Sequence, residues 1–135
     1  MLACTLHQRG EEGSRPVYVH AKIGIVDDAW MTVGSANLND HSLFNDTEVN
    51  LAVYDREVAR TTRERLWAEH LELPVAGVSG DPTAVIDELW KPQAEEQRRR
   101  LTAGEPMTHR LATLPHASRR SERLRGPLQN LLLDG

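Results

Sequence analysis

Apolar and polar residues alternate in three stretches of the first half of the chain, which predicts three short β-strands. The first strand runs from about Val17 to Val26, the second covers MTVGSAN (31–37), and the third covers TEVNLAVYD (47–55). The residues DDAW between the first two predict a hairpin. One face of the first strand should be pure core, formed by Val17, Val19, Ala21, Ile23 and Ile25.

The next part of the chain has helical spacing. Residues 56–73 lack Gly and Pro, follow Asp55 as an N-cap and end before Pro74, so they predict a helix. A second helix should cover 81–90, with Asp81 as N-cap and Pro82 at the first helical position. A third is expected around 93–102, followed by an irregular tail that could dock through LQNLLL (128–133). The remaining polar or Gly- and Pro-containing segments predict loops or linkers, at 7–16, 38–46 and 74–80.

Composition limits the chain to one domain or part of one. It has 135 residues, of which 39% are hydrophobic, and no window approaches 18 consecutive apolar residues. The first residues have neither a basic region nor an apolar run typical of a signal peptide. We therefore expect a cytoplasmic or peripheral membrane protein. The single cysteine, Cys4, excludes an internal disulfide framework and a Cys-based zinc site.

Charge is distributed unevenly along the chain. Residues 1–91 carry 8 Lys and Arg against 15 Asp and Glu, whereas residues 92–135 carry 8 against 5. Because affinity for nucleic acid rests mainly on basic side chains, the acidic first part makes a nucleic-acid partner unlikely. A small phosphorylated substrate remains compatible with this distribution.

The first predicted strand carries unexpected chemistry on its second face. His20 and Lys22 share that face, so an imidazole stands beside an ammonium group. This pair suits a phosphate, because lysine supplies a fixed positive charge and an imidazole with a pKa near ~6.5 can act as nucleophile or proton donor. Asp27 has the opposite parity, so we assign it a structural role at the turn.

Further polar residues follow on the next two strands. Ser35 and Asn37 offer uncharged hydrogen-bond donors to phosphate oxygens, and Gly34 permits close backbone approach. Glu48 faces away from the apolar side of its strand and would orient the His20 ring if the strands bring them together. A purely structural histidine is the alternative. A metal site is disfavoured, because lysine is not a usual ligand and no second histidine lies at i+2 or i+4.

These residues form a recognisable motif. His20, Lys22 and Asp27 read H-x-K-x4-D and are followed by GSANLN and by NDTEVN, which contains Glu48. By average residue usage, H-x-K-x4-D alone arises in roughly one chain in a hundred of this length, and this chain has only two lysines. Over residues 16–73 the sequence resembles the phospholipase D superfamily, in particular the C-terminal half of bacterial phospholipase D and cardiolipin synthase-like proteins.

The resemblance implies a partial α/β (α+β) domain and a phosphodiesterase or phosphatidyltransferase that acts on phospholipids without a metal or other cofactor. His20 would be one of two active-site histidines, of which one forms a phosphohistidine and the other protonates the leaving alcohol. Lys22 and Asn37 would bind the phosphate, Ser35 would assist, and Glu48 would orient His20. Asp27 would complete the motif away from the site.

Members of this family need two such motifs, and this chain has one, because no other histidine is followed by lysine at the second position. We expect a fragment that supplies one motif, with the second provided upstream in the same polypeptide or by a homodimer partner. On this interpretation residues 1–75 are a catalytic half that is incomplete at its N-terminus, residues 76–135 are a helical, Arg-rich extension, and His20 is the general acid.

Two other functions stay open. A dimeric single-motif nuclease would use the same chemistry on nucleic acid, and a catalytically inert half-domain would use none. The Arg groups at 98–100 and 118–125 are compatible with peripheral contact with an anionic membrane or with a solvated charged surface.

Overall fold

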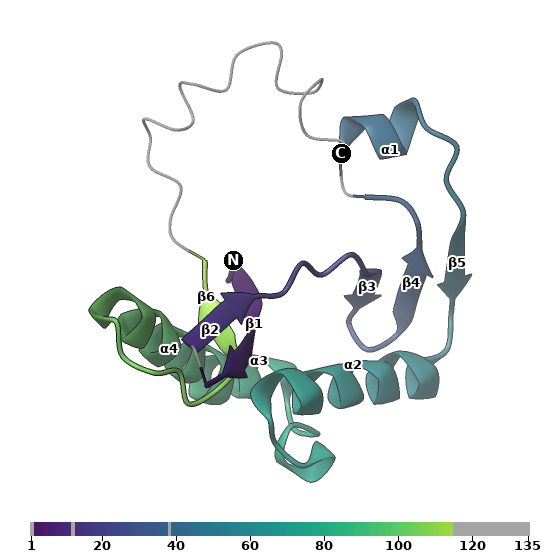
Figure 1. The fold of residues 1–135 in the computed structure, drawn as a ribbon. Coiled ribbons are helices and arrows are strands. Elements are labelled where there is room, and N and C mark those ends of the chain that lie inside the picture. The colour runs from purple at the N-terminus through teal and green to yellow at the C-terminus, as the bar shows by residue number, and fades with distance from the viewer. Residues whose placement is uncertain (1, 12, 38, 115–135) are drawn as a thin grey trace.

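The structure is a computed structural model that describes residues 2–11, 13–37 and 39–114 (Figure 1). These residues form two three-stranded sheets and a set of helices, in agreement with the expected α+β class. The segment LQNLLL, which was expected to dock, lies outside the described residues.

The first sheet has the order β2-β1-β6 and was not predicted. β1 (Cys4–Gly10) and β2 (Gly13–Pro16) form an antiparallel hairpin, so the prediction of a loop over 7–16 is wrong. β6 (Leu111–Thr113) pairs antiparallel with β1 and lies within the segment that was expected to be irregular. The outer part of the hairpin is polar and exposed, so backbone pairing rather than burial of an apolar face defines it.

The second sheet has the order β3-β4-β5 and contains the three predicted strands in shortened form. β3 covers Lys22–Val26, β4 covers Trp30–Gly34 and β5 covers Asn50–Val53. The predicted hairpin is confirmed. Its turn places Asp27 (φ 52°) and Asp28 (φ 49°) in the left-handed region, as a type I′ turn requires. The predicted loop at 38–46 instead contains a short helix, α1 (Asp40–Phe44).

The helix α2 (Arg56–Leu71) confirms the first helical prediction. Asp55 caps it by accepting hydrogen bonds from the backbone N–H groups of Glu57 and Val58, at 2.9 and 3.0 Å. The helix ends at Glu72, whose φ of 57° is left-handed. A 3₁₀ turn, η1 (Val75–Gly77), occupies part of the predicted linker at 74–80.

The last two predicted helices are one continuous helical segment. α3 (Pro82–Val85), with the expected Asp81 cap, continues through a π-helical turn, η2 (Ile86–Trp90), into α4 (Lys91–Ala103). The predicted break before residue 93 is wrong for a physical reason. Proline cannot donate a backbone hydrogen bond and clashes with the carbonyl four residues back. The π turn shifts the bonding to five residues, with Lys91 N–H bonded to the Ile86 carbonyl, and so accommodates Pro92 without ending the helix.

The main core lies between the helices and the first sheet. Its buried members are Ala68, Leu71, Val78, Val85, Ala94 and Leu111. Trp67 and Trp90 pack against this cluster and contact each other edge to face, with ring centroids 5.6 Å apart. Residues on both sides of position 75 contribute to this one core.

A buried ion pair attaches the β3–β4 hairpin to α2. The Arg63 guanidinium donates two hydrogen bonds to the Asp28 carboxylate, at 2.7 and 2.9 Å, and a third to the carbonyl of Val78 at 3.2 Å. The guanidinium carbon of Arg63 also lies 4.6 Å from the centre of the Trp67 ring. Arg63 therefore fixes the turn end of the second sheet against the helices.

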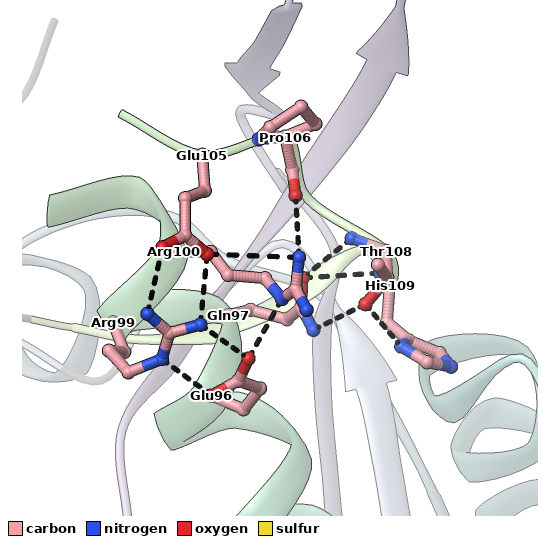
Figure 2. A network of polar contacts seen from close by, with 8 residues as sticks. All are labelled: Glu96, Gln97, Arg99, Arg100, Glu105, Pro106, Thr108 and His109. Carbon is pink, nitrogen blue, oxygen red and sulfur yellow. Dashed lines mark hydrogen bonds and ion pairs between the residues drawn. The ribbon is translucent and has the colours of Figure 1, made fainter. Parts of the chain in front are cut away.

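A polar network holds the return from α4 to β6 (Figure 2). The buried Gln97 side chain accepts hydrogen bonds from the backbone N–H groups of Thr108 and His109, at 2.8 and 3.2 Å, and donates one to the Thr108 hydroxyl at 2.9 Å. Around it, Arg99 and Arg100 form ion pairs with Glu96 and Glu105. Two of the three arginines at 98–100 are thus engaged with carboxylates of the chain itself.

The predicted core face of the second sheet is only partly covered. On this face, the cross-strand row nearest the turn contains the buried Met31. The next row on the same face, Ile23–Val33–Leu51, has side chains that are 40%, 39% and 63% exposed. Val17 and Val19 are exposed as well, so the prediction of a pure core face is wrong. A groove of about 620 Å³ separates residues of this face from α2 and from Ile86 and Trp90.

Candidate active site

Several of the predicted site residues, among them Lys22, Ser35 and Glu48, lie at the end of the second sheet opposite α2. Figure 1 shows α1 and α2 at opposite ends of this sheet. At the α1 end, Lys22, Gly34 and Asn50 are neighbours across the three strands. Ser35 and Asn37 follow β4 directly, and Glu48 comes just before β5.

Gly34 allows the two strands to approach at this end. A Cβ atom at this position would lie 2.3 Å from the Val49 carbonyl oxygen and 2.6 Å from the Asn50 Cα, and 1.9 Å from the Asn50 Oδ1. The first two are backbone atoms, which no rotamer change can move away. The site therefore requires glycine here.

Ser35 connects β4 with the segment before β5. Its backbone N–H donates to the Val49 carbonyl at 3.0 Å, and its hydroxyl oxygen accepts from the Val49 N–H, also at 3.0 Å. The hydroxyl donates its single proton to the Glu48 carboxylate. Next to it, the Ala36 N–H donates to Asn50 Oδ1 at 3.2 Å. Residues 34–36 and 48–50 are thereby interlocked.

Glu48 is the residue on which these contacts converge. The hydrogen bond from Ser35 lowers the pKa of its carboxyl group, the Ser42 hydroxyl lowers it further, and the charge of Lys22 acts in the same direction. The carboxylate is therefore held ionised near a lysine.

Sequence reasoning did not identify Ser42, because it lies in α1, where a loop was expected. A signal was present: Asn39, three residues earlier, is a favoured N-cap type. In the structure its side chain accepts from the Ser42 N–H at 2.8 Å.

His20 makes contacts of its own, which differ from those of Glu48. It precedes β3, so strand alternation does not fix the direction of its side chain, and the exposed ring stacks on Tyr18 with centroids 5.9 Å apart. Lys22 folds back to donate to the His20 backbone carbonyl at 3.0 Å. Among the described residues there is no hydrogen bond between the His20 ring and Glu48. The structure thus brings together Lys22, Ser35 and Glu48 but not the His20 ring.

The remaining predicted residues are accessible to solvent. Asn37 is exposed beyond the end of β4, and Asp27 is exposed in the turn at the far end of β3 from Lys22. Within residues 2–11, 13–37 and 39–114, no group of three or more His, Cys, Asp or Glu side chains is arranged to hold a metal ion. Metal independence stays a prediction.

Comparison with known proteins identifies the family. Residues 4–69 match the model of the cardiolipin synthase, phospholipase D-like domain. These residues belong to the phospholipase D superfamily. The match includes the second sheet, the first two strands of the first sheet and nearly all of α2.

Three relatives illustrate the range of the similarity. Phospholipase D zeta 1 of Arabidopsis thaliana is 33% identical over 103 residues, which cover 64% of this chain and 9% of the relative. Cardiolipin synthase B of Salmonella typhi is 44% identical over 48 residues, covering 36% of this chain and 12% of the relative. Phospholipase D A of Dictyostelium discoideum is 39% identical over 75 residues, which cover 42% of this chain and 6% of the relative. The chain therefore spans about a tenth of the length of these superfamily members or less.

The helices of the described part of this phospholipase D-like chain are too short or too polar to cross a membrane.

Proposed function

We propose that this chain supplies one half of the active site of a phospholipase D-type phosphodiesterase or phosphatidyltransferase. The observation that carries the proposal is the H-x-K-x4-D motif at His20–Asp27, whose Lys22 lies at the sheet end where Ser35 and Glu48 meet. The superfamily match over residues 4–69 supports the same assignment. The names of the relatives favour phospholipids as the substrate class.

The proposed reaction has two displacements at phosphorus. In the first, a ring nitrogen of one histidine forms a bond to phosphorus, the bond from phosphorus to the head-group oxygen breaks, and the second histidine donates a proton to that oxygen. In the second, water or another alcohol gives its proton to the second histidine and attacks phosphorus, and the phosphorus–nitrogen bond breaks. Water yields a phosphatidic acid, and an alcohol yields an exchanged head group.

This chain would provide His20 as the proton-transferring histidine and Lys22 as the cation that binds the phosphate oxygens. Asn37 lies exposed next to the site and would add an uncharged donor. For Glu48 to orient His20, the imidazole must leave Tyr18 and turn toward the carboxylate, because the ring stacks on Tyr18 in the free chain. The second histidine would come from a second motif, either in the same polypeptide or in a second copy of the chain.

The test is a turnover assay with phosphatidylcholine vesicles in the presence of a primary alcohol. We expect phosphatidic acid and the exchanged phospholipid as products. General acid catalysis contributes a rate factor on the order of 10²–10⁴, so His20→Ala should lower turnover by about that factor. Lys22→Ala should also lower it strongly. The matched control is Lys91→Ala, which removes the only other lysine, paired with Asp87 on the helical segment.

The dependence of turnover on chain concentration tests whether a second copy of the chain supplies the second motif. A specific rate that rises with chain concentration would indicate that two copies form the site. If the isolated chain turns nothing over, a titration with inorganic phosphate followed by NMR decides the matter. We then expect saturable shifts at His20 and Lys22 that Lys22→Ala abolishes. Absence of both turnover and such binding would refute the proposed function, as would equal turnover in the wild type and His20→Ala.

A further inference from the structure

Tyr18 precedes the motif by two residues and is 82% exposed. Its ring stacks on the imidazole of His20, with centroids 5.9 Å apart and an angle of 22° between the ring planes. The other aromatic ring contacts in the described part of the chain are edge to face, with interplanar angles of 62°, 68° and 87°. The Tyr18 ring thus lies in solvent with its flat face against a residue of the motif.

The contacts of His20 place Tyr18 on the side of the leaving group. Lys22 Nζ donates to the backbone carbonyl of His20 at 3.0 Å, whereas Tyr18 contacts the imidazole ring. In the proposed reaction Lys22 binds the phosphate and the imidazole protonates the head-group oxygen. The head group is attached to that oxygen and therefore lies next to the imidazole. The aromatic ring that contacts the imidazole is Tyr18.

The face of a tyrosine ring attracts cations, because the π electrons make it negative. The head groups choline and ethanolamine carry an ammonium group close to their ester oxygen, whereas glycerol carries hydroxyl groups only. In the free chain the imidazole occupies one face of the Tyr18 ring. When the imidazole turns toward Glu48, as the proposed function requires, it vacates this face for the ammonium group of a substrate.

We propose that Tyr18 forms a head-group subsite, in which a quaternary or primary ammonium group packs on the tyrosine ring in place of the His20 imidazole. The inference rests on the proposed function, because the head group lies here only if His20 acts at the leaving oxygen. Tyr18 is then a specificity-determining residue, through which no covalent or proton-transfer step passes. The chain accordingly prefers phospholipids with an ammonium head group to those with an uncharged one.

The primary test compares the binding of phosphocholine and of glycerol phosphate to the full chain by NMR titration. Both probes are phosphate monoesters, but only phosphocholine carries an ammonium group. A cation on an exposed aromatic face gains about two- to fivefold in affinity, so phosphocholine should bind more tightly by about this factor. The ring signals of Tyr18 should shift with phosphocholine, and they are readily assigned because the chain has only two tyrosines.

Three variants separate the ring face from other effects. Tyr18→Leu should abolish the preference for phosphocholine, and Tyr18→Phe should retain it, because phenylalanine keeps the aromatic face. Tyr54→Leu is the matched control. Tyr54 is 84% exposed, but it follows β5 at the other end of the sheet and contacts Trp30 edge to face. A preference that survives in Tyr18→Leu, or that disappears equally in Tyr54→Leu, would overturn the inference.

The outcomes distinguish the subsite from the proposed function. Equal affinity of the wild type for the two probes would overturn the subsite alone, because the phosphate site would still be present. If neither probe nor inorganic phosphate binds and no phospholipid is turned over, the proposed function fails and the subsite fails with it.

Turnover gives a second measure of the same preference. Vesicles of phosphatidylcholine and of phosphatidylglycerol are compared in the wild type and in each variant. The ratio of the two kcat/KM values should fall about two- to fivefold in Tyr18→Leu and stay near the wild-type ratio in Tyr18→Phe and Tyr54→Leu. An unchanged ratio in Tyr18→Leu would contradict a role of Tyr18 in head-group selection.

Discussion

Replacing Gly34 by alanine is the sharpest test of how the site is built. The added Cβ atom would lie 2.3 Å from the Val49 carbonyl oxygen and 2.6 Å from the Asn50 Cα. Carbon contacts in proteins are comfortable only near 3.5–4.0 Å, so β4 and β5 must separate at this end. The separation should break two hydrogen bonds next to Gly34, from Ser35 N–H to the Val49 carbonyl and from Ala36 N–H to Asn50 Oδ1.

The expected loss of stability follows from these contacts. Overpacking costs about 1–3 kcal/mol, and each hydrogen bond contributes about 1 kcal/mol net. Partial relaxation of the exposed edge strand reduces the total, so we expect about 3 kcal/mol. For a chain of this length, that corresponds to a fall in Tm of about 12 °C.

The assay is thermal and urea unfolding followed by circular dichroism, with two glycine controls. Gly24→Ala places a Cβ on β3 at 3.2 Å from a Thr32 methyl group, which can shift, and Gly80→Ala meets nothing within 4 Å. Both should change stability by less than about 1 kcal/mol. A Gly34→Ala chain that melts within 2 °C of Gly24→Ala would refute the reasoning, because the strands would then have room that the structure denies them.

Three other predictions concern the rest of the fold. Asp28→Asn should cost about 3 kcal/mol in urea unfolding, because it leaves the buried Arg63 guanidinium without its charge partner, and a loss below 1 kcal/mol would contradict the ion pair. The pKa of Glu96 is lowered from 4.5 to about 2, first by hydrogen bonds from Arg99, and then by the charge of Arg99 and by the hydrogen bond and charge of Arg100. The ionised Glu96 carboxylate therefore stabilises the fold above pH 4.5, and this stabilisation is lost as the pH falls toward 2. Glu96→Gln should make the free energy of unfolding less dependent on pH between these values, and an unchanged pH dependence would argue against the network. Burial raises the pKa of the Cys4 thiol, so Cys4 should react more slowly with a disulfide reagent at pH 8 in the native chain than in guanidinium, and equal rates would contradict its burial.

Local signals predicted the elements that depend on neighbouring residues. The Asp55 and Asp81 caps, the Pro74 stop and the hairpin at 27–29 all appear in the structure. Their energetics lie within a few residues of sequence, which is why a single sequence suffices. The π turn at 86–90 is also local, but Pro92 in a helical pattern more often ends a helix than it distorts one.

The first sheet could not be predicted from the same signals. β6 pairs Leu111 with Leu6 across more than a hundred residues, and neither strand has an extended alternating pattern. Its position instead depends on Gln97, which binds the backbone of Thr108 and His109. Sequence alternation also does not determine the orientation of the His20 side chain. Alternation holds only inside a paired strand, and pairing of β3 begins at Lys22, two residues after the histidine.

The candidate site is ordered although the apolar face of the second sheet is only partly covered. Alternation shows which face of a strand is apolar, but not whether the chain provides a layer to cover it. Here α2 is tied to the turn end through Arg63, while the row Ile23–Val33–Leu51, nearer the site, stays exposed. The site end is instead held by the close approach of the strands at Gly34, by the Ser35–Val49 pair and by the hydrogen bond from the Ser35 hydroxyl to Glu48. Because these contacts are local, substitutions at Gly34 or Ser35 should disturb the site more than substitutions in the helical core do, even where the latter cost more global stability.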